Sequence, residues 1–163
     1  MSLQAVFHIM DELYEAHKQL LALSTEKTER LKDGDIEHLQ PLLAKERKQA
    51  RAIDLLEQKR QQVTTQWFQL IGKADEEQTV SRMLDLINDE ADRNLLAEQY
   101  EKFILLLADI KNQEQLNRQM IEQSLQFIDL SLNMLQPSLQ QVNYQKTPKD
   151  RPVQKRSVFD SKA

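Results

Sequence analysis

Hydrophobic residues recur in alternating steps of four and three along residues 2–33, with polar residues between them. This spacing is typical of a helix that presents a heptad stripe to its neighbours. Ser2 is a favourable N-cap and Asp33-Gly34 a favourable end, so the pattern predicts a first helix between them. Extra apolar residues widen the stripe on one side, as expected of a helix with two neighbours. The stripe positions are Val6, Met10, Leu13, His17, Leu20, Ser24, Lys27 and Leu31, flanked by Phe7, Tyr14 and Leu21.

A second stripe begins after Pro41, a residue that fits the first turn of a helix because it has no N–H to leave unpaired. We expect Asp35 to cap a short turn, Ile36–Gln40, and the second helix to run from Pro41 to about Ile71. Several stripe positions are polar, which weakens a coiled coil while it fixes the register, so we predict moderate stability. The stripe comprises Leu42, Glu46, Gln49, Ile53, Leu56, Arg60, Val63, Trp67 and Leu70.

A third helix is predicted from about Asp89 to Gln136, after a connector, residues 73–89, that contains one amphipathic turn, Val80–Ile87. At ~1.5 Å per residue this helix would be about 70 Å long, against roughly 45 Å for each of the other two. It must therefore bend, or its end must extend beyond its partners. One of its stripe rows is Tyr100, Leu107, Glu114, Ile121, Ile128 and Leu135, and the other is Leu96, Phe103, Ile110, Asn117, Ser124 and Ser131.

The second half of this third helix carries a surplus of apolar residues, arranged as a shallow trough with serines at its floor. They span roughly 160° of a helical wheel, more than the ~100° stripe of a typical surface helix. Either this wide face packs into the bundle, or part of it receives a partner helix, for which methionine, phenylalanine and small residues are well suited. This apolar face comprises Met120, Ile121, Ser124, Leu125, Phe127, Ile128, Ser131, Leu132, Met134, Leu135 and Leu139.

Composition agrees with a long-helix protein. The chain of 163 residues has two glycines and four prolines, three of which fall in the last 27 residues. We predict an all-α fold, an elongated antiparallel three-helix bundle or coiled coil, with a helical domain over residues 1–139. Residues 1–145 carry 16 basic and 24 acidic side chains, whereas residues 146–163 carry six and two. Residues 140–163 are therefore expected to form a flexible basic tail.

Candidate chemistry is sparse. The two glycines, Gly34 and Gly72, are isolated, so no phosphate-binding loop is expected, and His8, His17 and His38 lack metal-ligand spacing. We expect no enzymatic activity, no cofactor and no metal, and we interpret His17 and Trp67 as core residues. With no cysteine, no signal peptide evident and no apolar run long enough for a membrane span, a cytoplasmic protein is expected. Its acidic body disfavours nucleic acid.

Several features together resemble the FlgN family of flagellar export chaperones, particularly those of Gram-positive bacteria. These are the length, the lack of cysteine, three long helices, the stretch GDIEHLQPLLAKERKQARAIDLLEQK and the terminal SVFDSKA. The resemblance implies a cytosolic, non-enzymatic chaperone that binds the C-terminal amphipathic helices of the hook–filament junction proteins FlgK and FlgL. It also implies delivery of these clients to the type III export gate, with Tyr144 as the contact to the gate. The apolar face would hold the client.

Two other classes of function remain open from the residues alone. The chain could be a structural coiled-coil adaptor or homo-oligomer, in which the third helix pairs with a second copy, or a regulator of another helical partner. We expect a monomer or a weak homo-oligomer. The terminal Val158 and Phe159 are read either as part of an inert end or as a short docking motif.

Overall fold

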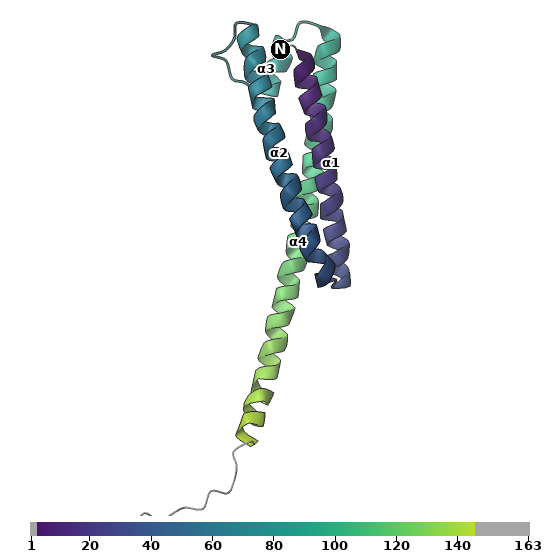
Figure 1. Cartoon of the computed structure of the whole chain (residues 1–163), viewed down its shortest axis with the longest axis vertical. Coiled ribbons are helices and arrows are strands. Elements are labelled where there is room, and N and C mark those ends of the chain that lie inside the picture. Colours follow the sequence, from purple (N-terminus) through teal and green to yellow (C-terminus); the bar gives the residue numbers. More distant parts are fainter. Residues whose placement is uncertain (1–2, 146–163) are drawn as a thin grey trace, which may run out of the picture. The chain divides into compact units, whose positions relative to one another are not determined.

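The computed structural model describes residues 3–145, except that the side chains of residues 136–145 are left undescribed. Over this range the chain is helical and contains no strand, which confirms the all-α fold class. Four helices are present where three were predicted: α1 (Leu3–Asp33), α2 (Ile36–Leu70), α3 (Val80–Leu86) and α4 (Glu90–Gln145) (Figure 1). The chain divides into two compact units, Met1–Glu122 and Gln123–Ala163.

The turn between α1 and α2 is built around Gly34, whose φ of 67° is a left-handed conformation that favours glycine. Asp35 caps α2, since its carboxylate accepts the backbone N–H of His38 at 3.3 Å. The separate turn predicted over Ile36–Gln40 is wrong, because α2 is continuous from Ile36 and contains Pro41. Pro41 has no N–H to donate to the carbonyl of Glu37, and Glu37 is an exposed residue, so the loss of this one bond is tolerated.

A glycine also ends α2. Gly72 has φ 73°, its N–H bonds the carbonyl of Gln69 at 3.1 Å, and the N–H of Lys73 bonds the carbonyl of Phe68 at 2.9 Å. This is the Schellman arrangement expected at a helix C-terminus. The amphipathic turn predicted over Val80–Ile87 is confirmed as α3, which Thr79 caps through a bond from the N–H of Arg82 at 3.2 Å.

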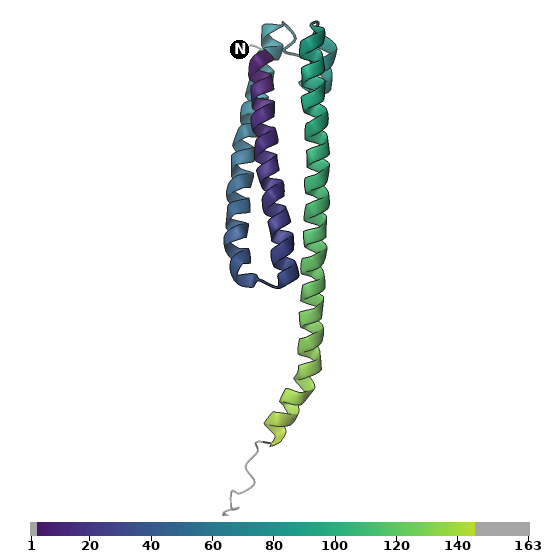
Figure 2. The ribbon, with the colours of Figure 1, turned by 90° about the vertical axis from the view of Figure 1, so that its right-hand side faces the viewer.

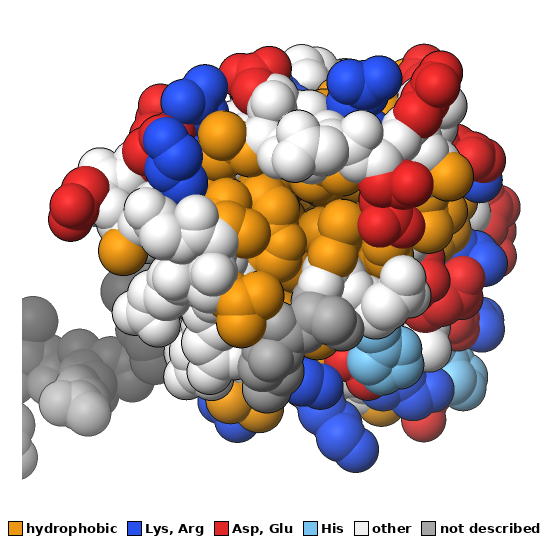
Figure 3. Space-filling view, turned by 90° about the horizontal axis from the view of Figure 1, so that it is seen from above, with side chains coloured by type: hydrophobic (Ala, Val, Ile, Leu, Met, Phe, Trp, Pro, Cys, Tyr) orange, Lys and Arg blue, Asp and Glu red, His pale blue; other side chains and the backbone are white. Residues whose placement is uncertain are grey.

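All four helices contribute to one apolar core in the first unit. Phe68, Met83 and Leu96 are fully buried, and Trp67 meets Phe68 edge-to-face at 5.1 Å between ring centroids. Seen along the bundle from the end where α1 begins, hydrophobic side chains gather in the middle and charged ones surround them (Figure 3). Trp67 is thus a core residue, as predicted. The core cluster comprises Val6, Phe7, Met10, Val63, Trp67, Phe68, Met83, Ile87 and Leu96.

Long-range hydrogen bonds give the helix directions in the first unit. The α1–α2 turn makes these helices antiparallel, whereas α1 and α4 run in the same direction. The amide of Gln99 donates to the carbonyl of Phe7 at 3.1 Å, and the amide of Asn117 donates to the carbonyl of Ser24 at 2.9 Å. Figure 2 shows α1 and α2 side by side with α4 alongside them. The predicted hydrogen bond of His17 is present, since its Nδ1 donates to the carbonyl of Leu13 at 2.7 Å, but the side chain is only half-buried and does not belong to the buried core.

Two sequence predictions about the helices are corrected. Leu70, assigned to the α2 stripe, is 68% exposed, and the unassigned Phe68 is buried instead. A straight helix drifts about 20° per heptad relative to a strict seven-residue repeat, so after four heptads the buried side has moved past Leu70. The predicted helix end at Gln136 is also wrong, because α4 continues to Gln145 and crosses the predicted boundary between residues 139 and 140. Pro137 removes only one helical hydrogen bond, and no glycine follows it before Gln145.

Candidate functional site

Most of the described side chains of the apolar face are exposed, and most of these belong to the second unit. Phe127 is 71% exposed, Met134 72%, and Leu132 55%. Sequence analysis left two interpretations open: the face packs into the bundle, or it receives a partner helix. They differ in whether the chain itself covers these side chains. The structure leaves them accessible to water, which is the condition that partner binding requires. Ile121, Leu125, Ile128 and Leu135 are exposed as well.

The remaining predicted members of this face differ in burial. Met120 is half-buried at the end of the first unit, and Ser124 is exposed. Ser131 is half-buried, and its hydroxyl donates to the carbonyl of Phe127 at 2.8 Å, within its own helix. Leu139 and Tyr144 lie within the helical backbone of α4, but their side chains are outside the described residues. The predicted flexible tail falls mainly on residues 146–163, which are likewise outside them.

The face carries almost no charge. Between Gln123 and Leu135 the one ionisable side chain is Asp129. By the helical period of 100° per residue, Asp129 lies just outside the apolar arc, about 40° beyond Leu125. Recognition at this face would therefore depend on apolar contact rather than on ion pairs. One further exposed leucine, Leu130, at 59%, falls outside the arc, and for this reason sequence analysis did not select it.

A buried polar layer precedes the apolar face along α4 and joins three helices. The ammonium of Lys27 in α1 lies 2.8 Å from the carboxylate of Glu46 in α2 and 3.0 Å from that of Glu114 in α4. Burial by itself lowers the pKa of Lys27, but the hydrogen bonds and charges of Glu46 and Glu114 outweigh it and raise the pKa above 10.5. The layer thus holds a charged lysine between two carboxylates.

Neutral side chains complete this polar layer. The side-chain amide of Asn117 donates to the backbone carbonyl of Ser24, and its carbonyl oxygen accepts the hydroxyl of Thr28 at 2.6 Å. The Ser24 hydroxyl donates to Glu114. Sequence analysis placed Glu114 and Asn117 at stripe positions, but it could not name their partners, since the α1 partners lie about 90 residues away in the chain.

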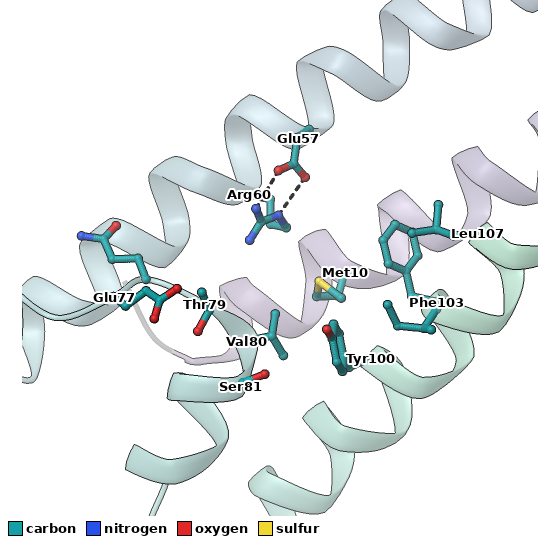
Figure 4. A pocket seen from close by; sticks show the side chains of 12 residues that line it. Met10, Glu57, Arg60, Glu77, Thr79, Val80, Ser81, Tyr100, Phe103 and Leu107 are labelled. Atoms are coloured by element: carbon teal, nitrogen blue, oxygen red, sulfur yellow. Dashed lines mark hydrogen bonds and ion pairs between the residues drawn. The ribbon is translucent and has the colours of Figure 1, made fainter. Parts of the chain in front are cut away.

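A second candidate is a cavity of about 570 Å³ on the side of the first unit, which sequence analysis missed (Figure 4). Met10, Tyr100 and Leu107 give it an apolar wall. Glu57 and Arg60 of α2 face it as an ion pair with nitrogen–oxygen distances of 2.6 and 2.8 Å, and the hydrogen bond from Arg60 is the main cause of the lowered pKa of Glu57. The three-residue spacing of Glu57 and Arg60 on one helix could have indicated the ion pair, but local sequence could not show that the connector residues Glu77–Ser81 line the same cavity.

Among the described residues, no group of three or more histidine, aspartate or glutamate side chains is placed to hold a metal ion. Within the same residues, no helix is both long enough and apolar enough to cross a membrane.

Comparison with known proteins decides the family. The model of the FlgN protein family matches residues 1–151. The chain belongs to the FlgN family. It is also 34% identical to the uncharacterized protein YvyG of Bacillus subtilis (strain 168) over 165 aligned residues, which cover the whole of both chains. No solved structure matches it. FlgN proteins are flagellar export chaperones and not enzymes, so this FlgN protein is assigned to flagellar assembly by its family.

Proposed function

We propose that this FlgN protein is a cytoplasmic export chaperone that binds the C-terminal amphipathic helices of the hook–filament junction proteins FlgK and FlgL. The single observation that carries the proposal is the exposed apolar face of α4, which is wide, nearly uncharged and regular in helical spacing. An amphipathic helix that is disordered when free would fold on this face and bury its own apolar side. Family membership supplies the flagellar context.

Binding is tested with the purified chain and a C-terminal helical segment of FlgK or FlgL, titrated by calorimetry. Phe127→Asp and Leu132→Asp should each weaken binding about 10-fold or more, because burying one such side chain contributes roughly 1.5–3 kcal/mol. Asn133→Asp is the control, since Asn133 is exposed and lies on the side of the helix opposite the arc. It should change the affinity by less than about 2-fold.

Circular dichroism and sedimentation separate the alternatives. If the face is open in the free protein, both face variants keep their helicity. Global unfolding of both would mean that the face is buried in the bundle, and unchanged client binding by two folded variants would contradict the proposal. A homodimer that the face variants dissociate, without any client binding, would favour the coiled-coil adaptor.

Delivery to the export gate is the second part of the proposal. We keep Tyr144 as the contact to the gate, because a phenol can stack or donate a hydrogen bond at a partner surface. Tyr144→Ala should leave client affinity unchanged and reduce export of the junction proteins, and hence motility. A Tyr144→Ala strain that swims and exports normally would exclude this contact while leaving the client face untouched.

A further inference from the structure

Positive side chains gather on the exposed side of α2, within residues 45–51 of the first unit. Within the described part of the chain, none of them makes an ion pair or a side-chain hydrogen bond. Most other lysines and arginines of the described residues pair with a carboxylate, as Lys59 does with Glu12 at 3.1 Å. This basic patch comprises Lys45, Arg47, Lys48 and Arg51. It is a local concentration of positive charge that the rest of the described residues leave uncompensated.

The nearest carboxylates in the sequence do not neutralise the basic patch. Glu46 falls between its members, but its carboxylate points into the bundle and lies 2.8 Å from the ammonium of Lys27. Asp54, three residues after Arg51, is exposed and forms no ion pair with it. Residues 1–145 carry 16 basic and 24 acidic side chains, so the patch is opposite in sign to the average of the helical body.

An exposed leucine lies beside the basic patch on the same side of α2. Leu55 follows Arg51 by four residues and Lys48 by seven, spacings that place side chains on one side of a helix. The Leu55 side chain is 67% exposed, although full burial of a leucine is favourable by roughly 1.5–3 kcal/mol. Apolar and cationic surfaces are therefore adjacent on α2, and a partner that covers both would gain from both.

A second apolar surface borders the patch where α2 meets α1. A cavity of about 440 Å³ lies between these helices, and two lysines of the patch line it together with apolar side chains. Its one acidic lining residue, Glu26, is held in an ion pair with Arg30 at 3.4 Å. Small side chains at Ala22 and Ala52 leave room for a larger apolar side chain of a partner. The apolar and basic lining residues are Ala22, Leu23, Lys45, Lys48 and Ala52.

The chemistry around the patch favours one class of anionic partner. A nucleic acid binds through many phosphates along its backbone, and the acidic body outside the patch would repel those phosphates. A helix that binds an anionic membrane presents a wide apolar face beside its cations, whereas Leu55 is a single exposed side chain. A short acidic polypeptide can contact the patch alone, and its apolar side chains can cover Leu55 and enter the cavity.

We propose that the basic patch binds an acidic, amphipathic helix of a partner protein. Carboxylates of that helix would bind the patch cations, and its apolar side would cover Leu55 and enter the cavity between α1 and α2. The two arginines suit this role, because a guanidinium can bind a carboxylate through two parallel hydrogen bonds. The proposal is independent of the client face, since that face is nearly uncharged and selects a partner of different chemistry.

The test uses the full chain and a synthetic, fluorescently labelled acidic peptide. The peptide has about 18 residues, or five helical turns, with leucines in alternating steps of three and four and glutamates between them. A second peptide with glutamine in place of glutamate is the charge control. Fluorescence anisotropy should show at least about 10-fold tighter binding of the acidic peptide, and added salt should weaken it. Equal affinities of the two peptides would overturn the proposal.

Matched charge reversals locate the binding site. Arg47→Glu/Arg51→Glu should weaken binding of the acidic peptide at least about 10-fold. Arg93→Glu/Lys111→Glu is the control, because Arg93 and Lys111 are also exposed and have no ion pair among the described residues, and the net charge changes equally. The control should change the affinity by less than about 3-fold, with both variants keeping their helicity. Equal losses would mean that only the overall charge matters and would overturn the proposal.

Two further variants test the apolar contribution and the location. Leu55→Gln should weaken binding about 3-fold or more, and no change would overturn the amphipathic form of the partner. Phe127→Asp should leave the affinity for the acidic peptide within about 2-fold of the wild-type value. A loss in Phe127→Asp equal to that in Arg47→Glu/Arg51→Glu would assign the peptide to the apolar face and overturn the proposal.

Other occupants of the patch are distinguished with other probes. Phosphatidylglycerol vesicles and a single-stranded oligonucleotide should bind more weakly than the acidic peptide. Tighter binding of either one, lost in Arg47→Glu/Arg51→Glu, would overturn the proposal in favour of a membrane or a nucleic acid. Sedimentation should show no self-association that this double variant abolishes. Such self-association would assign the patch to a second copy of the chain and would likewise overturn the proposal.

Discussion

Both halves of α4 carry apolar stripes, but the two stripes have opposite surroundings. In the first half Leu96 and Leu106 are buried against other helices, whereas in the second half Phe127 and Met134 are among the most exposed hydrophobic side chains described. Removing apolar surface from water is favourable at about 25 cal/mol per Å², but only where a second surface is available to cover it. An apolar stripe therefore predicts that a helix can pack against another surface, but it does not show which surface covers it.

The buried polar layer lies between these halves in the sequence of α4. Glu114 and Asn117 replace apolar residues there, and each is satisfied by α1 side chains or backbone, with Lys27 also bound to Glu46 of α2. A misaligned α4 would leave these groups buried without partners, which costs more than a lost apolar contact. The layer therefore specifies the register of the three helices. Apolar residues that follow it are not required for that register.

The largest difference in stability is expected between alanine substitutions of two phenylalanines, one in each half of the comparison. Phe68 is fully buried in the core and Phe127 is exposed in the second unit. Phe68→Ala should lower the free energy of unfolding by about 3–5 kcal/mol, through lost burial and the cavity left behind. Phe127→Ala should change it by less than about 0.5 kcal/mol. Urea denaturation followed by circular dichroism measures both, and similar losses from the two variants would contradict the distinction between the halves.

A smaller loss of stability is expected from a substitution in the buried polar layer. Lys27→Met removes the cation that lies between Glu46 and Glu114 and should destabilise the protein by about 2–4 kcal/mol. This is below the range for a fully buried pair, because the Glu114 side chain is 44% exposed. Lys18→Met is the control, since Lys18 pairs with Glu15 at 3.2 Å on the exposed side of α1 and should change stability by less than about 0.5 kcal/mol. Equal effects of the two variants would show that the layer does not specify register through this lysine.

The smallest predicted effect is the loss of the Lys27 contribution to stability at alkaline pH. The pKa of Lys27 is raised above its unfolded value of 10.5, so its contribution is fully present below that pH and is lost as the pH rises through the folded pKa. The difference in unfolding free energy between the wild-type chain and Lys27→Met should therefore be constant at neutral pH and decrease above pH 10.5. Denaturation at a series of pH values checks this, and a difference that grows with alkaline pH would be opposite in sign.

Local signals predicted much of the fold. Gly34 and Gly72 end helices in left-handed conformations, and the amphipathic turn after residue 80 is a helix. Rules based on single residues failed where the rest of the helix or the tertiary packing favoured another structure. Pro41 and Pro137 lie inside helices, because a helix can lose one hydrogen bond when the rest of it is favourable. The strict heptad repeat placed Leu70 inside and missed Phe68, since the repeat ignores the drift of a straight helix.

The sequence by itself determined the helical class, most helix ends, the position of the apolar face and the absence of strong catalytic motifs, because these depend on spacing along a few turns. Tertiary structure alone decided which stripes are covered. It brought Lys27, Glu46 and Glu114 into one layer, formed the cavity beside Arg60, and left Phe127 and Leu132 accessible. Periodicity is a local property of the chain, whereas burial depends on residues that are distant in sequence. The same apolar pattern is therefore core in one half of α4 and exposed surface in the other.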